Sequence, residues 1–180
     1  MSLETAAPAR GEDAVLVAVQ STLAGRPGLL SGARALSHFG EHSAGWVGVA
    51  VLGAVLQPAR RRAWLTAGAG AFLAHAAAVV IKRIVKRERP SHPAIAVNVG
   101  TPSRLSFPSA HATSTTAAAI LLGRVTGLPL PVVLVPPMAL SRLVLGVHYP
   151  SDVVTGVAVG AVVAKVVSRL ADRVEGERAR

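Results

Sequence analysis

The stretch SRLVLGVHYPSD, residues 141–152, places an arginine, a histidine and an aspartate between two apolar segments. Two other stretches, KRIVKRERP at 82–90 and PSAH at 108–111, also lie at the ends of apolar segments. A chain that crosses a bilayer several times alternates between its two sides, and this alternation brings all three stretches to one membrane face. We therefore predict one site assembled from residues that are far apart in the sequence.

The composition of the chain indicates an integral membrane protein. Hydrophobic residues make up 51% of its 180 residues and charged residues only 16%, less charge than soluble domains usually carry. The net charge of +10 does not indicate a nucleic-acid partner, because the cations cluster at the ends of apolar runs rather than on one polar face. The chain has no cysteines, which excludes disulfides and thiolate metal sites.

The apolar segments predict an all-α, polytopic membrane helical bundle with about four to five transmembrane spans. The strongest segments lie at residues 43–57, 62–86, 109–126, 128–147 and 152–170. Two shorter ones, at 14–24 and 29–39, either lie at the membrane interface or form a broken first span. We expect Trp46 to anchor a helix end at the interface, and Pro136-Pro137 to kink or break their helix.

We expect a single membrane domain over residues 13–170, between a disordered tail at 1–12 and a basic tail at 171–180. The polar loop at 91–107 either covers the site or is a solvent-exposed linker. Gly156 and Gly160 form a GxxxG pattern, which marks either a dimer face or packing within the bundle.

The distribution of arginines predicts an orientation in the cell membrane. Arg60-Arg61-Arg62, Arg124 and the basic tail lie on the face opposite the three stretches. By the positive-inside rule, that opposite face is cytoplasmic. The predicted site then lies on the extracytoplasmic face.

Lys82 and Arg89 are candidates for binding a phosphate. Seven residues separate them, about two helical turns, so both point the same way if the helix continues to Pro90. An arginine offers phosphate oxygens a planar fork of donors, and a lysine offers a compact charge. The alternative is a basic stretch that holds anionic lipid headgroups. We favour that alternative for three basic neighbours, Arg83, Lys86 and Arg87.

Ser109 and His111 open the helix expected at 109–126. Ser109 suits an N-cap, and the first backbone N–H groups of a helix are free to bind an anion. His111, in the first turn, is placed to protonate a leaving alkoxide. Taken alone, the two residues are better explained as a capping serine and an interfacial histidine.

Arg142, His148 and Asp152 form the third motif. Asp152 can accept a hydrogen bond from one ring nitrogen of His148, which leaves the other nitrogen as a nucleophile. The alternative is an ordinary helix N-cap with a histidine at the interface. Two histidines, one carboxylate and three cations are the groups that metal-free phosphate ester cleavage needs.

The patterns K-x6-RP, PSxH and SR-x5-H-x3-D, in this order, resemble the type 2 phosphatidic acid phosphatase (PAP2) superfamily of lipid phosphatases and vanadium haloperoxidases. The resemblance includes the segment ALSHFG at residues 35–40 and covers most of residues 13–165. One departure is Ala110, where the family usually has glycine. Its methyl group limits the backbone conformation beside the phosphate pocket.

This resemblance implies a six-helix core and a two-step phosphoryl transfer without a metal ion or other cofactor. His148 would attack phosphorus while Asp152 orients it. His111 would protonate the leaving alcohol and then activate water. The phosphoryl oxygens would be held by Lys82, Arg89, Ser109, the Ala110 amide and Arg142.

The resemblance also implies a membrane lipid phosphate as substrate. The small size and the Ala-, Val- and Arg-rich composition are similar to those of members that act on a polyprenyl-phosphate-linked sugar phosphate in cell-wall synthesis. Phosphatidic acid, phosphatidylglycerophosphate and prenyl diphosphate remain alternatives. A vanadate-loaded haloperoxidase is a further alternative, which the apolar spans disfavour. A non-catalytic protein that binds anionic lipids is another, which the histidines and the carboxylate disfavour.

Overall fold

The computed structural model describes residues 8–178. These residues form seven α-helices with two short 3-10 turns, and contain only one isolated β-bridge, between Glu88 and Leu105. The all-α prediction is confirmed. The helices are α1 (Gly11–Leu23), α2 (Leu29–Gly40), α3 (Ala44–Leu56), α4 (Arg61–Val85), α5 (Ala110–Thr126), α6 (Leu130–Val144) and α7 (Pro150–Arg178). The 3-10 turns are Glu41–Ser43 and Pro58–Arg60.

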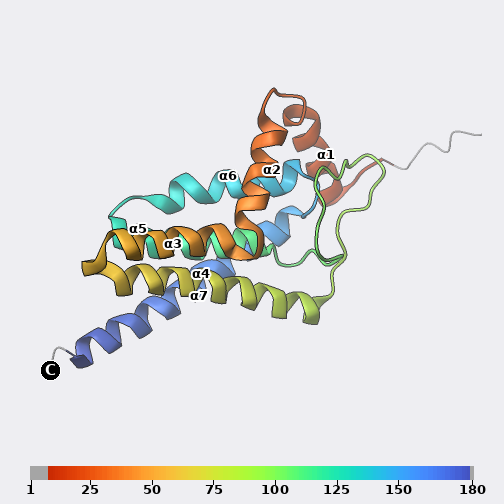
Figure 1. Ribbon diagram of the computed structural model, residues 1–180. Helices are drawn as coiled ribbons and strands as arrows, with labels where there is room; N and C mark the ends of the chain where they lie inside the picture. Colours follow the sequence, from red (N-terminus) through yellow and green to blue (C-terminus); the bar gives the residue numbers. More distant parts are fainter. Residues whose placement is uncertain (1–7, 179–180) are drawn as a thin grey trace, which may run out of the picture.

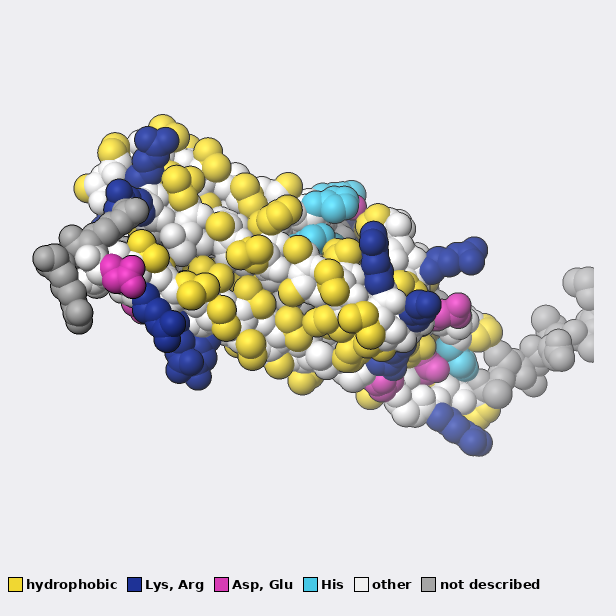
Figure 2. Space-filling model, turned by 90° about the horizontal axis from the view of Figure 1, so that it is seen from below, with side chains coloured by type: hydrophobic (Ala, Val, Ile, Leu, Met, Phe, Trp, Pro, Cys, Tyr) yellow, Lys and Arg dark blue, Asp and Glu magenta, His cyan; other side chains and the backbone are white. Residues whose placement is uncertain are grey.

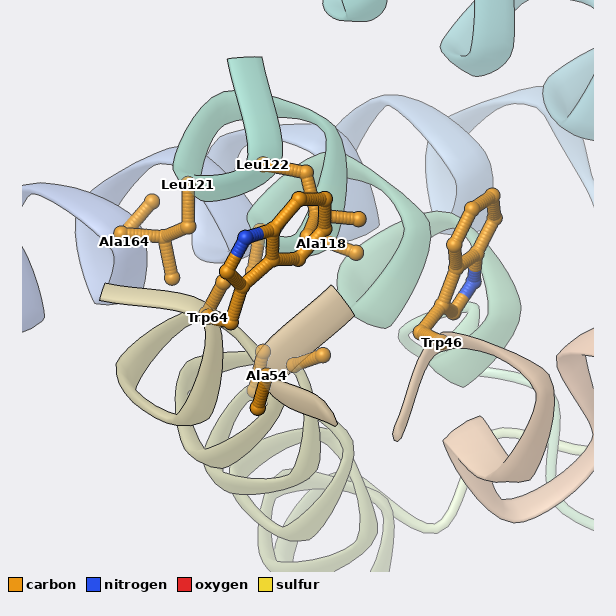
Figure 3. Close-up of a cluster of buried hydrophobic side chains, with 11 residues drawn as sticks. Trp46, Ala54, Trp64, Ala118, Leu121, Leu122 and Ala164 are labelled. Carbon is orange, nitrogen blue, oxygen red and sulfur yellow. The ribbon is translucent and has the colours of Figure 1, made fainter. Parts of the chain in front are cut away.

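Helix α5 is the centre of the bundle. It contacts each of the helices α2, α3, α4, α6 and α7, which together with it make a six-helix core (Figure 1). Its sequence explains this place, because small residues such as Ala117, Ala118 and Ala119 let neighbouring helices approach closely. Figure 3 shows Trp64 of α4 lying against Ala118 and Leu122 of α5 in the main hydrophobic cluster.

Three stretches of the described chain are long and apolar enough to cross a membrane: 29–56, 58–85 and 150–174. Helix α6 is also apolar but shorter, with 15 residues. Large hydrophobic side chains are exposed along these helices, as a lipid-facing surface requires. Figure 2 shows hydrophobic side chains covering the middle of the molecule, with Lys, Arg, Asp and Glu toward its two ends.

The N-terminal helices gather at one end of the bundle. Helices α1 and α2 lie there beside the loop that joins α4 to α5, and α2 runs across the direction of α3 (Figure 1). His42 and Ser43 make the bend between α2 and α3, with left-handed φ values of 50° and 58°. Of the tail expected at 1–12, residues 1–7 lie outside the described part, and α1 begins at Gly11.

One detail differs from the sequence predictions. Trp46 is not an interfacial anchor, because it is buried and its indole N–H donates to Thr115 Oγ1 at 3.1 Å. The hydroxyl groups of α5 give this tryptophan a polar partner inside the bundle. Of the two outcomes expected at Pro136-Pro137, a kink or a break, the break does not occur, because α6 continues to Val144.

The GxxxG pair serves packing within the bundle. A Cβ atom at Gly156 would lie 2.7 Å from the Ser109 carbonyl oxygen, and one at Gly160 would lie 2.3 Å from that of Thr113. The two glycines therefore let α7 approach the backbone of α5. This contact also brings the start of α7, with Asp152, next to the start of α5.

Candidate active site

A cavity of about 390 Å³ lies at the end of the bundle where the three sequence motifs meet. Its walls come from α2, α4, α5, α6, the turn after α6 and the loop between α4 and α5. Six of the predicted site residues line it: Lys82, Arg89, Ala110, His111, Arg142 and His148. Ser109 and Asp152 do not line the cavity, and both are fully buried. The expected convergence of the motifs at one place is thus what the structure shows.

His148 lies in the turn between α6 and α7, with Asp152 behind it. Its Nδ1 atom is 3.5 Å from Asp152 Oδ2, and this contact is not a hydrogen bond, so Nδ1 has no hydrogen-bond partner in the described part of the chain. Such contacts are often long before a substrate binds and shorten in the reacting complex. The backbone N–H of Tyr149 donates to the same Oδ2 atom at 2.8 Å and fixes the carboxylate.

The tautomer of His148 follows from its other neighbour. Arg89 Nη1 lies 3.3 Å from His148 Nε2. A guanidinium can only donate, so Nε2 must accept, and the ring proton of a neutral imidazole must then sit on Nδ1, facing Asp152. Nε2 consequently carries the lone pair at the cavity, which is the arrangement that a nucleophilic histidine needs.

Burial and nearby cations keep His148 neutral. Burial lowers the pKa of its imidazole well below the usual value, and the charges of Arg89, Lys82 and Arg142 lower it further. Burial also lowers the pKa of the Arg89 guanidinium, to about 10, which leaves it charged at pH 7. The site thus combines an uncharged nucleophile with positive charge for an anion.

His111 is held by α2. Its Nε2 atom lies 2.8 Å from the backbone carbonyl oxygen of Ser37, which can only accept, so Nε2 carries a proton. Nδ1 is then the atom available for proton transfer. The approach of α2 depends on Gly40, because a Cβ atom there would lie 2.8 Å from His111 Cδ2.

Arg142 is almost completely buried, with 2% of its surface exposed. Its Nη1 donates to Ser37 Oγ and its Nε to Ser141 Oγ, each at 3.0 Å. Its Nη2 is also buried and has no hydrogen-bond partner in the described part of the chain. A buried donor without a partner lowers the stability of the fold. An anion bound in the cavity would give Arg142 Nη2 the partner that it lacks.

Lys82 and Arg89 meet at the cavity through the loop and not through helix periodicity. Helix α4 ends at Val85, and Lys86 takes a left-handed conformation with φ 55°, so the condition that the helix continues to Pro90 fails. Lys82 Nζ donates to the carbonyl oxygens of Leu105 and Ser106 at 3.2 and 2.6 Å. Arg89 Nε donates to that of Ser103 at 2.8 Å, so loop carbonyls position both cations.

Ser109 caps α5, as the sequence predicted. Its Oγ accepts from the backbone N–H of Ala112 at 3.3 Å, and its own N–H donates to the Asp152 carbonyl oxygen at 2.9 Å. Ala110 and His111, at the N-terminus of α5, line the cavity, and the first N–H groups of a helix are free to bind an anion. A phosphate-binding role for the Ser109 hydroxyl remains a prediction.

The loop between α4 and α5 covers the cavity. Gly100, Thr101, Pro102, Ser103 and Leu105 line it, so this part of the loop is more than a solvent-exposed linker. The loop is fixed to the N-terminal helices. Gln20 of α1 bonds both backbone groups of Ala96, and Arg34 of α2 bonds the Asn98 carbonyl oxygen.

Sequence reasoning missed the roles of three residues around this site: Ser37, Arg87 and Glu12. Ser37 holds His111 by its carbonyl group and Arg142 by its hydroxyl; its segment was singled out, but its role was not. Arg87 bonds Asp152 Oδ1 at 3.0 Å and Glu12 Oε2 at 2.6 Å. The interpretation of Arg87 as a headgroup-binding residue is therefore wrong, because its guanidinium is occupied by two carboxylates.

The described residues contain no group of three or more His, Cys, Asp or Glu side chains that could hold a metal ion. Around the cavity lie the predicted histidines His111 and His148, with a carboxylate behind His148, and four cationic side chains: Lys82, Arg83, Arg89 and Arg142. Comparison with known proteins gives a match to the model of the PAP2 superfamily over residues 63–175. The chain belongs to the PAP2 superfamily.

Similar PAP2 proteins come from mycobacteria. The chain is 82% identical over 147 residues to decaprenylphosphoryl-5-phosphoribose phosphatase of Mycolicibacterium smegmatis, with 82% of each chain covered. It is 71% identical over 171 residues to the protein of the same name from Mycobacterium tuberculosis, with 95% of this chain and 94% of that one covered.

Two solved structures share the PAP2 fold. The transmembrane PAP2-type phosphatidylglycerolphosphate phosphatase of Bacillus subtilis superposes with a TM-score of 0.68 at 22% identity, covering 88% of this chain and 85% of that one. LpxE of Aquifex aeolicus gives a TM-score of 0.64 at 18% identity, covering 86% and 93%. At this identity the likeness concerns the fold, and it agrees with a membrane helical bundle.

Replacing Gly40 with alanine is expected to lower kcat at least about tenfold, because the added methyl group displaces the His111 ring. Gly32→Ala is the matched control. Gly32 lies in the same helix, with no atom within 4 Å of its would-be Cβ. The measurement is steady-state phosphate release by both variants in detergent. Equal kcat values for the two variants would contradict the placement of α2 against His111.

Proposed function

We propose that this PAP2 protein is a phosphoric monoester hydrolase that removes the phosphate monoester of decaprenylphosphoryl-5-phosphoribose. The assignment of the substrate is supported by the 82% and 71% identity, over most of the chain, to two phosphatases of that name. The geometry supports the reaction class, because the neutral His148 lies at a cavity that Lys82, Arg89 and Arg142 line. A role in cell-wall synthesis stays a prediction.

In the first step, His148 Nε2 attacks phosphorus and the ester P–O bond breaks. Positive charge develops on the imidazole, and Asp152 stabilises it through Nδ1–H. His111 first takes the remaining proton of the phosphate monoester at Nδ1, and it then gives this proton to the departing alkoxide oxygen of the sugar. The products of this step are the dephosphorylated lipid and a phosphohistidine at His148.

In the second step, a water molecule attacks the phosphohistidine. His111, now neutral at Nδ1, takes a proton from that water as the N–P bond breaks. Inorganic phosphate leaves, and His148 returns to its starting form. Throughout, the phosphoryl oxygens contact Lys82, Arg89, Arg142 and the first backbone N–H groups of α5. Catalysis by these groups is positioning and charge stabilisation.

The active site is proposed to face the extracytoplasmic side of the cell membrane. The support is the arginine-rich end at Arg60-Arg61-Arg62 and Arg124, which the positive-inside rule places in the cytoplasm. The site lies at the other end of the bundle. A lipid substrate would keep its isoprenoid chain in the bilayer while its headgroup enters the cavity.

Phosphate release by the purified protein in detergent with EDTA tests the proposal. The substrates are decaprenylphosphoryl-5-phosphoribose, phosphatidic acid, phosphatidylglycerophosphate and a prenyl diphosphate. We expect the first to be hydrolysed fastest, without a divalent metal ion, and vanadate to inhibit. A strict metal requirement would refute the mechanism. Faster release from another lipid would refute the substrate, and folded protein that binds these lipids without turnover would favour the non-catalytic alternative.

A further inference from the structure

Glu12, in the first turn of α1, reaches the back of the active site. Its Oε2 atom accepts from Arg87 Nη2 at 2.6 Å, and its Oε1 atom accepts from the Ser151 N–H at 2.8 Å. Ser151 lies in the first turn of α7, next to Asp152. An acidic residue near the N-terminus thus contacts the same helix start that carries the carboxylate behind His148.

Arg87 joins the two carboxylates. Its Nη1 donates to Asp152 Oδ1 at 3.0 Å and to Ser151 Oγ at 2.7 Å, while its Nη2 donates to Glu12 Oε2. Its guanidinium carbon also lies 4.0 Å from the centre of the Tyr149 ring. A planar guanidinium stacked on a ring and bonded along both of its edges has little freedom to rotate.

We propose that Glu12 is a positioning residue for the reaction: it fixes Arg87 against Asp152 and so sets the place and the charge of the carboxylate that orients His148. This inference rests on the proposed function. Asp152 is fully buried, and its two oxygens are divided between Arg87 on one side and Tyr149 N–H with His148 Nδ1 on the other. Movement of Arg87 would therefore rotate the carboxylate away from the 3.5 Å contact with His148.

The charge balance gives Glu12 a second effect. Arg87 alone would neutralise Asp152, whereas Glu12 and Asp152 together leave the group of three with a net negative charge. That negative charge favours the positive imidazole formed when Nε2 attacks phosphorus. Removing the Glu12 charge thus weakens stabilisation of the transition state more than binding of the substrate, since no atom of Glu12 lines the cavity.

Helix α1 has other attachments, so a Glu12 variant is expected to fold. Leu16 is completely buried, and Gln20 bonds the carbonyl oxygens of Ala96 and Val144 at 2.7 and 3.0 Å. A glutamine at position 12 retains an oxygen that can accept from the Ser151 N–H. The substitution Glu12→Gln therefore removes the charge and leaves the helix docked.

The test is phosphate release from decaprenylphosphoryl-5-phosphoribose by the full chain carrying Glu12→Gln. We expect kcat to fall about tenfold with KM nearly unchanged. Asp172→Asn is the matched control. It removes a carboxylate from a pair of similar length, Arg124–Asp172 at 2.8 Å, roughly thirty ångströms further along α7 from Asp152. Its kcat should equal that of the native chain.

A double-mutant cycle separates positioning from a merely structural role. If Glu12 acts through Arg87, then Glu12→Gln has almost no further effect on kcat in an Arg87→Gln background. A full second loss in the double variant, or a rise in KM at constant kcat, would overturn the proposal.

A spectroscopic measurement keeps this test independent of the substrate. The ¹⁵N shifts of His148 report the ring tautomer, and we expect them to change in Glu12→Gln and not in Asp172→Asn. Should the native chain release phosphate from no lipid, the proposed function fails, while the shifts still decide the positioning role. Identical His148 shifts in the native chain and in Glu12→Gln would overturn it.

Discussion

Replacing His148 with alanine is expected to reduce phosphate release by at least about 10⁴-fold, because no other group can form the covalent intermediate. The imidazole is buried, with Arg89 Nη1 3.3 Å from its Nε2 and Asp152 Oδ2 3.5 Å from its Nδ1. The lipid should still bind, since Lys82, Arg89 and Arg142 are unchanged.

Three measurements check this expectation. Steady-state phosphate release gives kcat, and rapid quenching with ³²P-labelled substrate shows whether an acid-labile phosphohistidine forms. His38→Ala is the control, because His38 is an exposed histidine of α2 that does not line the cavity. Native-like turnover by His148→Ala, or labelling that persists in this variant, would assign the nucleophile to a different residue.

The three motifs were sufficient to predict that the site would assemble, because the alternation of spans leaves the chain few other ways to arrange them. Apolar length predicted the helices within a few residues, except that α7 continues to Arg178, through most of the stretch expected to be a basic tail. The Ser109 N-cap of α5 followed from local hydrogen-bond chemistry. These features depend on short stretches of sequence, which is why they could be read without a structure.

What could not be predicted depends on contacts between distant residues. Glu12 lies 75 positions from Arg87, in a stretch whose composition suggested a disordered tail. The loop carbonyls that hold Lys82 and Arg89 carry no sequence signal, because every residue has a carbonyl group. Trp46 was predicted to be an interfacial anchor. Its actual partner, the Thr115 hydroxyl that accepts from its indole N–H, is 69 residues away in the sequence and could not be recognised from it.

Replacing Arg142 with methionine is expected to lower kcat/KM by about 10³-fold, as the loss of a buried donor to transition-state charge does in other enzymes. The free energy of unfolding should rise or stay constant. Arg142 is buried and lines the same cavity as Lys82 and Arg89, and its Nη2 has no hydrogen-bond partner among the described residues. A methionine of similar length removes this unfavourable buried charge. Activity and stability are thus opposed at this position.

Vanadate separates the two effects of Arg142→Met. In the native chain, vanadate bound at the cavity should raise Tm in proportion to its binding free energy. We expect Arg142→Met to lose most of that rise while its Tm without vanadate is no lower than native. Arg62→Met, at an exposed position near the other end of α4, should keep both values. A large fall in Tm without vanadate would mean that Arg142 supports the fold, and the phosphate-binding role would then need evidence from another residue of the cavity.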